Sequence, residues 1–244
     1  MSKTRRIASK KNRSSAQQNR LGMRDIDPIT ETQCEMFDLY DDGYNIAAIG
    51  TAGTGKTMCA LYLALSDVME YPEYDRVIIV RSAVQTREQG FMPGSKTQKE
   101  AVFTGPYADI VNNLFGRGDA WEILKTKRTI EFMTSSFVRG LTFDNAIIIV
   151  DECQSMTYHE LDTIITRVGE SSRIIFCGDT AQDDLQQSRN RADISGLFDF
   201  MKVLDKVPSF RTCKFTPEDI VRSGLVREYI LAKEASSFMP RVAA

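Results

Sequence analysis

The sequence predicts an α/β fold in which a mostly parallel β-sheet is covered by helices on both faces. Three observations predict this fold: short apolar runs rich in β-branched residues recur along the chain, helical patterns separate them, and each run is continuous rather than alternating. Continuous apolar runs are typical of strands that are buried on both faces of a parallel sheet. The runs are NIAAIG (45–50), RVIIVR (76–81), TIEFMT (129–134), NAIIIVD (145–151) and RIIFCGD (173–179).

The first 24 residues differ in composition from the rest of the chain. They carry eight Lys or Arg and no acidic residue, which leaves 23 basic and 33 acidic residues in the remainder. Because the stretch is polar and has no apolar run, we expect a flexible tail and neither a signal peptide nor a membrane anchor. Two interpretations stay open for this tail, a solubilising terminus and an arm that binds nucleic acid. No stretch has the ~18 apolar residues of a membrane span, so a soluble, cytoplasmic protein is expected.

The remaining 220 or so residues fit one domain. We expect it to occupy residues 25–235, with a tail at 236–244. Residues 84–118 interrupt the alternation of strands and helices with Gly, Pro and charged residues, and we interpret them as an insertion on the ligand side of the sheet. A disordered spacer is the alternative interpretation of this insertion.

Three helices are predicted from local patterns. The segment Lys56–Met69 has the length and composition of a helix, and an apolar stripe runs from Leu161 to Val168 at helical spacing. The sequence TPED at 216–219 provides an N-cap, a Pro at the first helical position and acids in the first turn. A helix is therefore expected to begin there and run toward Ala232.

Neither the cysteines nor the histidine indicates a site of thiolate or imidazole ligands. The five cysteines form no C-x-x-C pair, so we interpret them as reduced and structural. The only histidine, His159, falls at the start of a predicted helix, where a surface or capping role is expected.

The sequence GTAGTGKT at 50–57 has the spacing of a phosphate-binding loop, G-x-x-x-x-G-K-[ST]. In such a loop backbone N–H groups surround the phosphates, Lys56 reaches the β- and γ-phosphates, and the Thr57 hydroxyl binds Mg²⁺. A strand before the loop and a helix after it provide the expected context. The predicted nucleotide-binding residues here are Gly50, Thr51, Ala52, Gly53, Thr54, Gly55, Lys56, Thr57 and Met58.

Two acids follow the strand at 145–150. A carboxylate that ends a buried strand is costly unless it meets a cation, and in enzymes with this loop the cation is Mg²⁺. We therefore predict Asp151 as a second Mg²⁺ ligand beside Thr57. The adjacent Glu152 is predicted to orient or deprotonate the water that attacks the γ-phosphate.

The sequence GDTAQ at 178–182 follows the next strand along the chain. Because ligands bind at the carboxyl ends of the strands in open α/β sheets, these residues are expected near the same nucleotide. The amide of Gln182 can donate to the γ-phosphate and accept from the attacking water. Gln182 is therefore predicted as a catalytic residue with Lys56 and Glu152.

The order of these motifs resembles the PhoH-like family of P-loop ATPases, which are related to the first RecA-like domain of superfamily 1 helicases. The resemblance covers residues 28–235 and includes AGTGKT, VIIVRSAVQTREQGFMPG, FVRGLTFDNAIIIVDECQ, ITRVG, GDTAQ, ISGL and DIVRSGLV. It implies a three-layer RecA-like P-loop NTPase fold with ATP and Mg²⁺ as cofactors. Two motifs depart from the family pattern, VRSAV and VDECQ, and both keep Arg81 and the two carboxylates in place.

The resemblance also implies residues that contact the base and a nucleic acid. Gln33 matches the glutamine that reads the adenine edge in helicase-like domains, and Arg81 matches an element that contacts single-stranded nucleic acid. Arg139 is assigned with Arg81 to this second group. Aromatic residues of the insertion, such as Phe103 and Tyr107, have two open interpretations, stacking on bases and packing in the core.

The related helicases have a second RecA-like domain that supplies an arginine to the transferred phosphate. The length of this chain leaves no room for such a domain, so the arginine is expected from another subunit of a homo-oligomer, with a hexameric ring as one arrangement. Arg167 and Arg222 are the first candidates for this role, and Arg139 is the third.

We interpret the protein as a Mg²⁺-dependent ATPase that couples hydrolysis to binding or remodelling of single-stranded RNA or DNA. A second interpretation is an ATP-gated regulatory protein that hydrolyses ATP slowly and moves nothing. A P-loop kinase for a small molecule is disfavoured, because a kinase has no need of a water-activating Glu152.

Overall fold

The computed structural model describes residues 21–82, 96–179 and 196–237 and contains one six-stranded sheet. All five strand pairs are parallel, and the order across the sheet is β3-β2-β4-β5-β1-β6. The strands are β1 (Asn45–Gly50), β2 (Arg76–Arg81), β3 (Ile130–Thr134), β4 (Ala146–Val150), β5 (Arg173–Gly178) and β6 (Phe210–Phe215). The parallel sheet that the apolar runs predict is confirmed.

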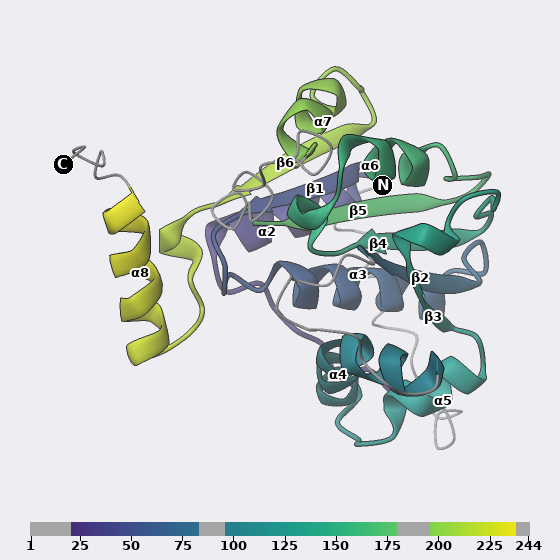
Figure 1. Cartoon of the computed structure of the whole chain (residues 1–244). Helices are drawn as coiled ribbons and strands as arrows, with labels where there is room; N and C mark the ends of the chain where they lie inside the picture. The colour runs from purple at the N-terminus through teal and green to yellow at the C-terminus, as the bar shows by residue number, and fades with distance from the viewer. Residues whose placement is uncertain (1–20, 83–95, 180–195, 238–244) are drawn as a thin grey trace.

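Helices cover both faces of this sheet, which gives the three-layer RecA-like fold of P-loop NTPases (Figure 1). The first core cluster joins one face to α2 (Glu31–Asp41), α3 (Lys56–Glu70), α4 (Lys96–Phe115) and α5 (Ala120–Thr126). The second joins the other face to α6 (Tyr158–Ile165) and α7 (Leu197–Leu204). Side chains alternate between the two clusters along each strand, as in Ala47 and Ala48 of β1. Short 3₁₀ turns are η1 (Ser135–Phe137), η2 (Cys153–Ser155) and η5 (Pro217–Asp219), and α8 is Leu225–Ser237.

Among the helices within 21–82, 96–179 and 196–237, none combines the length and the apolar character that a membrane crossing requires. The described cysteines are free thiols: Cys34 is exposed, and the other four are buried. Burial raises the pKa of the Cys59 and Cys213 thiols to about 12.

The prediction of a single helix from residue 216 toward residue 232 is wrong. TPED forms only the 3₁₀ turn η5, in which Thr216 and Asp219 form a capping box, and α8 begins at Leu225. Two features separate the two elements. The backbone N–H of Val221 donates to the Gly53 carbonyl oxygen at 3.1 Å, and Gly224 has a positive φ of 58°. The chain is thereby held against the loop after β1 before the helix begins.

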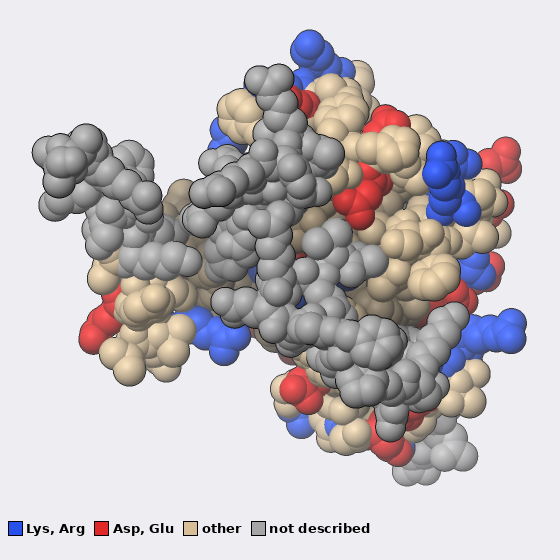
Figure 2. Space-filling view, viewed as in Figure 1, with Lys and Arg blue, Asp and Glu red and all other residues tan. Residues whose placement is uncertain are grey.

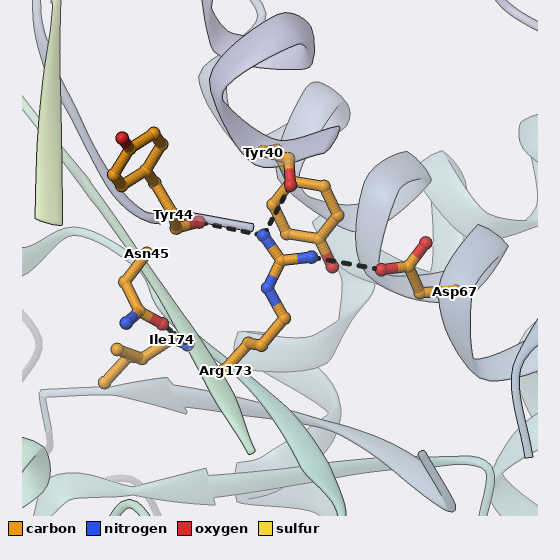
Figure 3. Close-up of polar contacts among 6 residues, drawn as sticks. All are labelled: Tyr40, Tyr44, Asn45, Asp67, Arg173 and Ile174. Atoms are coloured by element: carbon orange, nitrogen blue, oxygen red, sulfur yellow. Dashed lines mark hydrogen bonds and ion pairs between the residues drawn. The ribbon is translucent and has the colours of Figure 1, made fainter. Parts of the chain in front are cut away.

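Arg173, at the amino end of β5, contacts both α2 and α3. Figure 3 shows its guanidinium group between the Tyr40 and Tyr44 carbonyl groups and the Asp67 carboxylate. Its Nη2 donates to the two carbonyl oxygens at 2.6 and 2.8 Å, and Nη1 lies 3.3 Å from Asp67 Oδ2. Its Cζ also lies 3.5 Å from the centroid of the Tyr40 ring. One side chain at the start of β5 therefore joins the end of α2 to α3.

Candidate functional site

The loop between β1 and α3 leaves the sheet in a backbone conformation that requires glycine. Gly50, the last residue of β1, has a φ of 135°, and a Cβ atom there would lie 1.9 Å from the Phe215 carbonyl oxygen of the neighbouring strand. Gly55 has a φ of 84° and is the N-cap of α3. The helix therefore begins at Lys56 with its first N–H groups free of a side-chain cap, an arrangement that favours a bound anion.

Lys56 is folded back over this loop. Its amine donates to the Gly50 and Thr51 carbonyl oxygens at 2.8 and 2.6 Å, and the side chain is buried. Burial lowers the pKa of Lys56, and the nearby negative charge of Asp179 opposes that shift. A buried cation held mainly by carbonyl groups is well suited to a negatively charged phosphate, which would compete with those carbonyls for it.

Thr57 and Asp151 lie together, as the motif spacing predicts. The Thr57 hydroxyl donates to Asp151 Oδ1 at 2.9 Å, although 94 residues separate them. The other carboxylate oxygen, Oδ2, accepts a hydrogen bond of 2.8 Å from the hydroxyl of Tyr107 in α4. Burial raises the pKa of Asp151, the charge of Glu152 raises it further, and the two hydroxyl donors oppose the shift. These hard oxygen donors fit a Mg²⁺ ion, which prefers carboxylate and hydroxyl oxygens.

Glu152 follows Asp151 directly in the chain and has a left-handed backbone conformation, with φ 52° and ψ 42°. Its Oε2 accepts a hydrogen bond from the Gln154 amide, whose own Oε1 accepts from the Asp179 backbone N–H at 3.0 Å. Gln154 therefore links the predicted base to the end of β5. Sequence reasoning did not assign Gln154, although the motif VDECQ contains it two residues after Glu152.

A cavity of about 630 Å³ joins these groups. It lies at the carboxyl ends of the central strands, where open α/β sheets bind their ligands. Its volume is in the range of small-molecule sites. It is lined by Ala52, Gly53, Thr54, Gly55, Lys56, Thr57, Met58, Arg81, Pro106, Tyr107, Ile110, Asp151, Glu152, Cys177, Gly178, Asp179, Val221 and Arg222.

Helix α4 brings part of the predicted insertion to this cavity. Pro106, Tyr107 and Ile110 line it, while Phe115 packs in the core. Packing in the core therefore describes the Tyr107 and Phe115 rings in this structure.

Gln33 contacts the loop from the side of α2. Its Nε2 donates to the Thr54 carbonyl oxygen at 2.9 Å, and its Oε1 accepts from the Ile29 backbone N–H at 2.9 Å. The side chain is buried and lies behind the loop, outside the set of residues that lines the cavity. In this structure Gln33 thus fixes the loop backbone, and its contact with adenine remains a prediction.

The predicted arginines lie in different places. Arg81 and Arg222 line the cavity, and a Cβ atom at Gly53 would lie 3.1 Å from the Arg222 side chain. Arg167 follows α6, and its carbonyl oxygen accepts from the Phe143 N–H, close to the amino end of β4 and therefore away from the loop. Arg139 is exposed after η1. Gln182, the predicted γ-phosphate contact, lies outside the described residues.

The sequence of this chain is similar to that of known proteins. The family model described as PhoH-like protein matches residues 25–234. A PhoH-like protein of Synechocystis is 36% identical over 189 residues, covering 77% of this chain and 56% of the relative. Protein PhoH of Escherichia coli is 31% identical over 214 residues, covering 86% of this chain and 59% of the relative. The chain therefore spans a little over half the length of these curated relatives.

Among solved structures, the large terminase of a thermophilic bacteriophage in complex with ADP aligns with a TM-score of 0.49 and 11% identity. The alignment covers 88% of this chain and 51% of the terminase. The UvsW helicase of bacteriophage T4 aligns with a TM-score of 0.46 and 15% identity, over 80% of this chain and 62% of the helicase. The match of the family model over residues 25–234, on a parallel sheet that carries the expected phosphate-binding loop, shows that this chain belongs to the PhoH-like family.

Proposed function

We propose that this protein is a Mg²⁺-dependent ATPase that couples hydrolysis to the binding or remodelling of single-stranded nucleic acid in the cytoplasm. The observation that carries the ATPase part is the meeting of Lys56, Thr57, Asp151 and Glu152 around one cavity. Each of these side chains has a distinct task in phosphoryl transfer to water.

Lys56 and the N-terminus of α3 hold the phosphates and neutralise the charge that grows on the γ-phosphate oxygens. Thr57 and Asp151 would hold Mg²⁺, whose positive charge would stabilise the negative charge that grows on the phosphates during the reaction. Glu152, kept in place by Gln154, accepts the proton of the attacking water. We also propose that Gln33 contacts adenine with the part of its amide that Thr54 and Ile29 leave free.

The nucleic-acid part of the proposal depends on particular cations rather than on a large basic surface. Figure 2 shows that, on the face it presents, the described Lys and Arg side chains are interspersed with Asp and Glu. Arg81 lies at the end of β2 beside the nucleotide cavity, Arg139 is exposed after β3, and the basic residues of 1–24 add further positive charge. We propose that these groups contact the phosphates of a single strand.

The first test is ATP turnover by the purified protein with Mg²⁺, with and without single-stranded RNA or DNA. We expect nucleic acid to stimulate turnover, added salt to weaken that stimulation, and removal of residues 1–24 to weaken it further, because each lost phosphate contact reduces counterion release. A double-stranded competitor of the same length serves as the control for nonspecific charge effects. Turnover that no nucleic acid changes would favour the ATP-gated regulatory protein, and a phosphorylated small-molecule product would favour a kinase.

We further propose that the protein assembles with copies of itself and that a neighbouring copy supplies an arginine to the transferred phosphate. Two observations support this. Arg167 and Arg139 lie outside their own cavity, whereas Arg222 lines it, so we assign Arg222 a contact within its own chain. Helix α8 presents exposed apolar side chains, with Leu225 80% and Tyr229 67% exposed, and its Ile230 reaches Gly53 of the loop. A second copy seated on α8 would lie next to the nucleotide.

Light scattering in the presence of Mg²⁺ and a non-hydrolysable ATP analogue tests the assembly. We expect a mass that is a multiple of 27.5 kDa for the wild type and a smaller mass for a variant with Leu225→Asp and Tyr229→Asp. The matched control is Phe198→Asp, which places the same charge on an apolar side chain of α7 that is 72% exposed. A monomeric mass together with full activity at high dilution would contradict the proposal.

A further inference from the structure

Tyr107 makes a contact with the nucleotide site that the tasks described so far do not explain. It lies in α4, where Pro106 and Ile110 also line the cavity, and it is 1% exposed. Its hydroxyl donates to Asp151 Oδ2 at 2.8 Å. The two oxygens of Asp151 thus have two separate hydroxyl donors, Thr57 on Oδ1 and Tyr107 on Oδ2.

The Tyr107 ring is itself held in place. It packs against the Phe132 ring of β3, with the centroids 5.9 Å apart, inside the core cluster on that face of the sheet. The phenol hydroxyl donates this hydrogen bond to the Asp151 carboxylate, the chemical form of the side chain that binds a metal ion.

A core-filling role alone does not account for a hydroxyl at this position. A phenylalanine would make the same ring contact with Phe132 and would bury no polar atom. The hydroxyl instead provides a hydrogen bond to an oxygen of the buried Asp151 carboxylate, which lies near the charged groups of Glu152 and Arg81. In metal sites, groups that donate a hydrogen bond to a ligating carboxylate orient that carboxylate toward the metal.

We propose that Tyr107 is a positioning residue for Mg²⁺: its hydroxyl fixes the orientation of Asp151 so that Oδ1 faces Thr57 at the phosphate-binding loop. This inference rests on the proposed function, because it assumes that Thr57 and Asp151 bind Mg²⁺ with ATP. It adds that helix α4, part of the insertion between β2 and β3, sets how strongly the metal strengthens nucleotide binding.

The variant Tyr107→Phe removes the hydroxyl and keeps the ring. For each protein, the affinity for a non-hydrolysable ATP analogue is measured by calorimetry with Mg²⁺ and again with EDTA, and the ratio gives the gain from the metal. We expect the variant to lose about 10–100-fold of this gain, the usual effect of removing a group that orients a metal ligand. Its affinity without metal should be that of the wild type. Electron paramagnetic resonance of Mn²⁺ bound with the analogue should show the same loss directly.

Two further variants separate the hydroxyl from the packing around it. Phe132→Leu loosens the ring contact and keeps the hydroxyl, so most of the gain from Mg²⁺ should remain. Tyr62→Phe removes the hydroxyl of another buried tyrosine, which packs against Phe37 away from the cavity, and should leave the ratio unchanged.

Three results of these binding measurements would contradict the proposal, and they are distinguishable. A gain from Mg²⁺ in Tyr107→Phe equal to that of the wild type overturns the role of Tyr107 and leaves the proposed ATPase standing. A loss in Phe132→Leu as large as in Tyr107→Phe assigns the effect to packing and overturns the role of the hydroxyl. A wild type that binds the analogue equally well with Mg²⁺ and with EDTA overturns the metal site of the proposed function and this inference with it.

Discussion

Replacing Glu152 with Gln is expected to lower ATP turnover by roughly 10²–10⁴-fold, the contribution that a positioned general base usually makes. The amide keeps the shape of the side chain and can still bond to Gln154, but it cannot accept a proton from the attacking water. The groups that hold the phosphates, Lys56 and the start of α3, are unchanged. ATP should therefore bind with nearly the affinity of the wild type.

Turnover is measured by phosphate release with excess ATP, and binding by calorimetry with ATP at a temperature where the variant does not hydrolyse it. The matched control is Glu122→Gln, the same substitution at an exposed position in the first turn of α5. The control should retain full turnover. Turnover near that of the wild type in Glu152→Gln would show that another group accepts the proton.

Replacing Arg173 with Ala is expected to destabilise the protein by about 3–5 kcal/mol, the usual cost of removing one partner of a buried ion pair. The side chains of Arg173 and Asp67 are only 13% and 9% exposed. The substitution would take away the donor that Arg173 provides to the Asp67 carboxylate and to the Tyr40 and Tyr44 carbonyl groups. It would also remove the cation from the face of the Tyr40 ring.

Urea unfolding followed by circular dichroism measures this loss as a lower midpoint at an unchanged slope. Arg117→Ala is the control, because Arg117 pairs with Asp119 at the surface, where both side chains are largely exposed, and an exposed pair contributes little. Nucleotide affinity measured well below the unfolding temperature should not change, since Arg173 lies at the amino ends of the strands. An unchanged midpoint in Arg173→Ala would mean that water replaces the lost donor.

Much of the fold could be predicted because the strands at the centre of the sheet are buried on both faces. Such strands must be apolar without interruption, as AIIIV of β4 is, and the pattern is visible in the sequence alone. Strand β6 lies at the sheet edge and has the mixed sequence FRTCKF, which carries no such signal. The start of α8 was predicted nine residues too early, because a capping pattern at Thr216 cannot show that Val221 bonds to the loop.

In the candidate site, too, some residues could be predicted from the sequence and others could not. Thr57, Asp151 and Lys56 were predictable because the phosphate-binding loop and the acid after β4 have fixed local spacings that chemistry requires. Tyr107 was not predictable as a contact of Asp151, since the two residues are 44 positions apart and α5, β3, η1 and β4 lie between them. From the sequence alone, its ring could equally stack on a base or pack in the core. Only the packing of α4 against β3 decides where its hydroxyl points.

The hydrogen bond between Val221 and Gly53 connects the C-terminal segment to the phosphate-binding loop. The environment of this segment should therefore depend on whether a nucleotide is bound. The side chains of Arg222 and Ile230, which precede and follow Gly224, also lie close to Gly53. Phosphates bound in the loop would therefore lie near both of these side chains. A loop that closes around ATP and opens around the products would change the protection of this segment from proteases and from chemical labels. Helix α8 is thus a natural place to attach a reporter that distinguishes the empty protein from the loaded one.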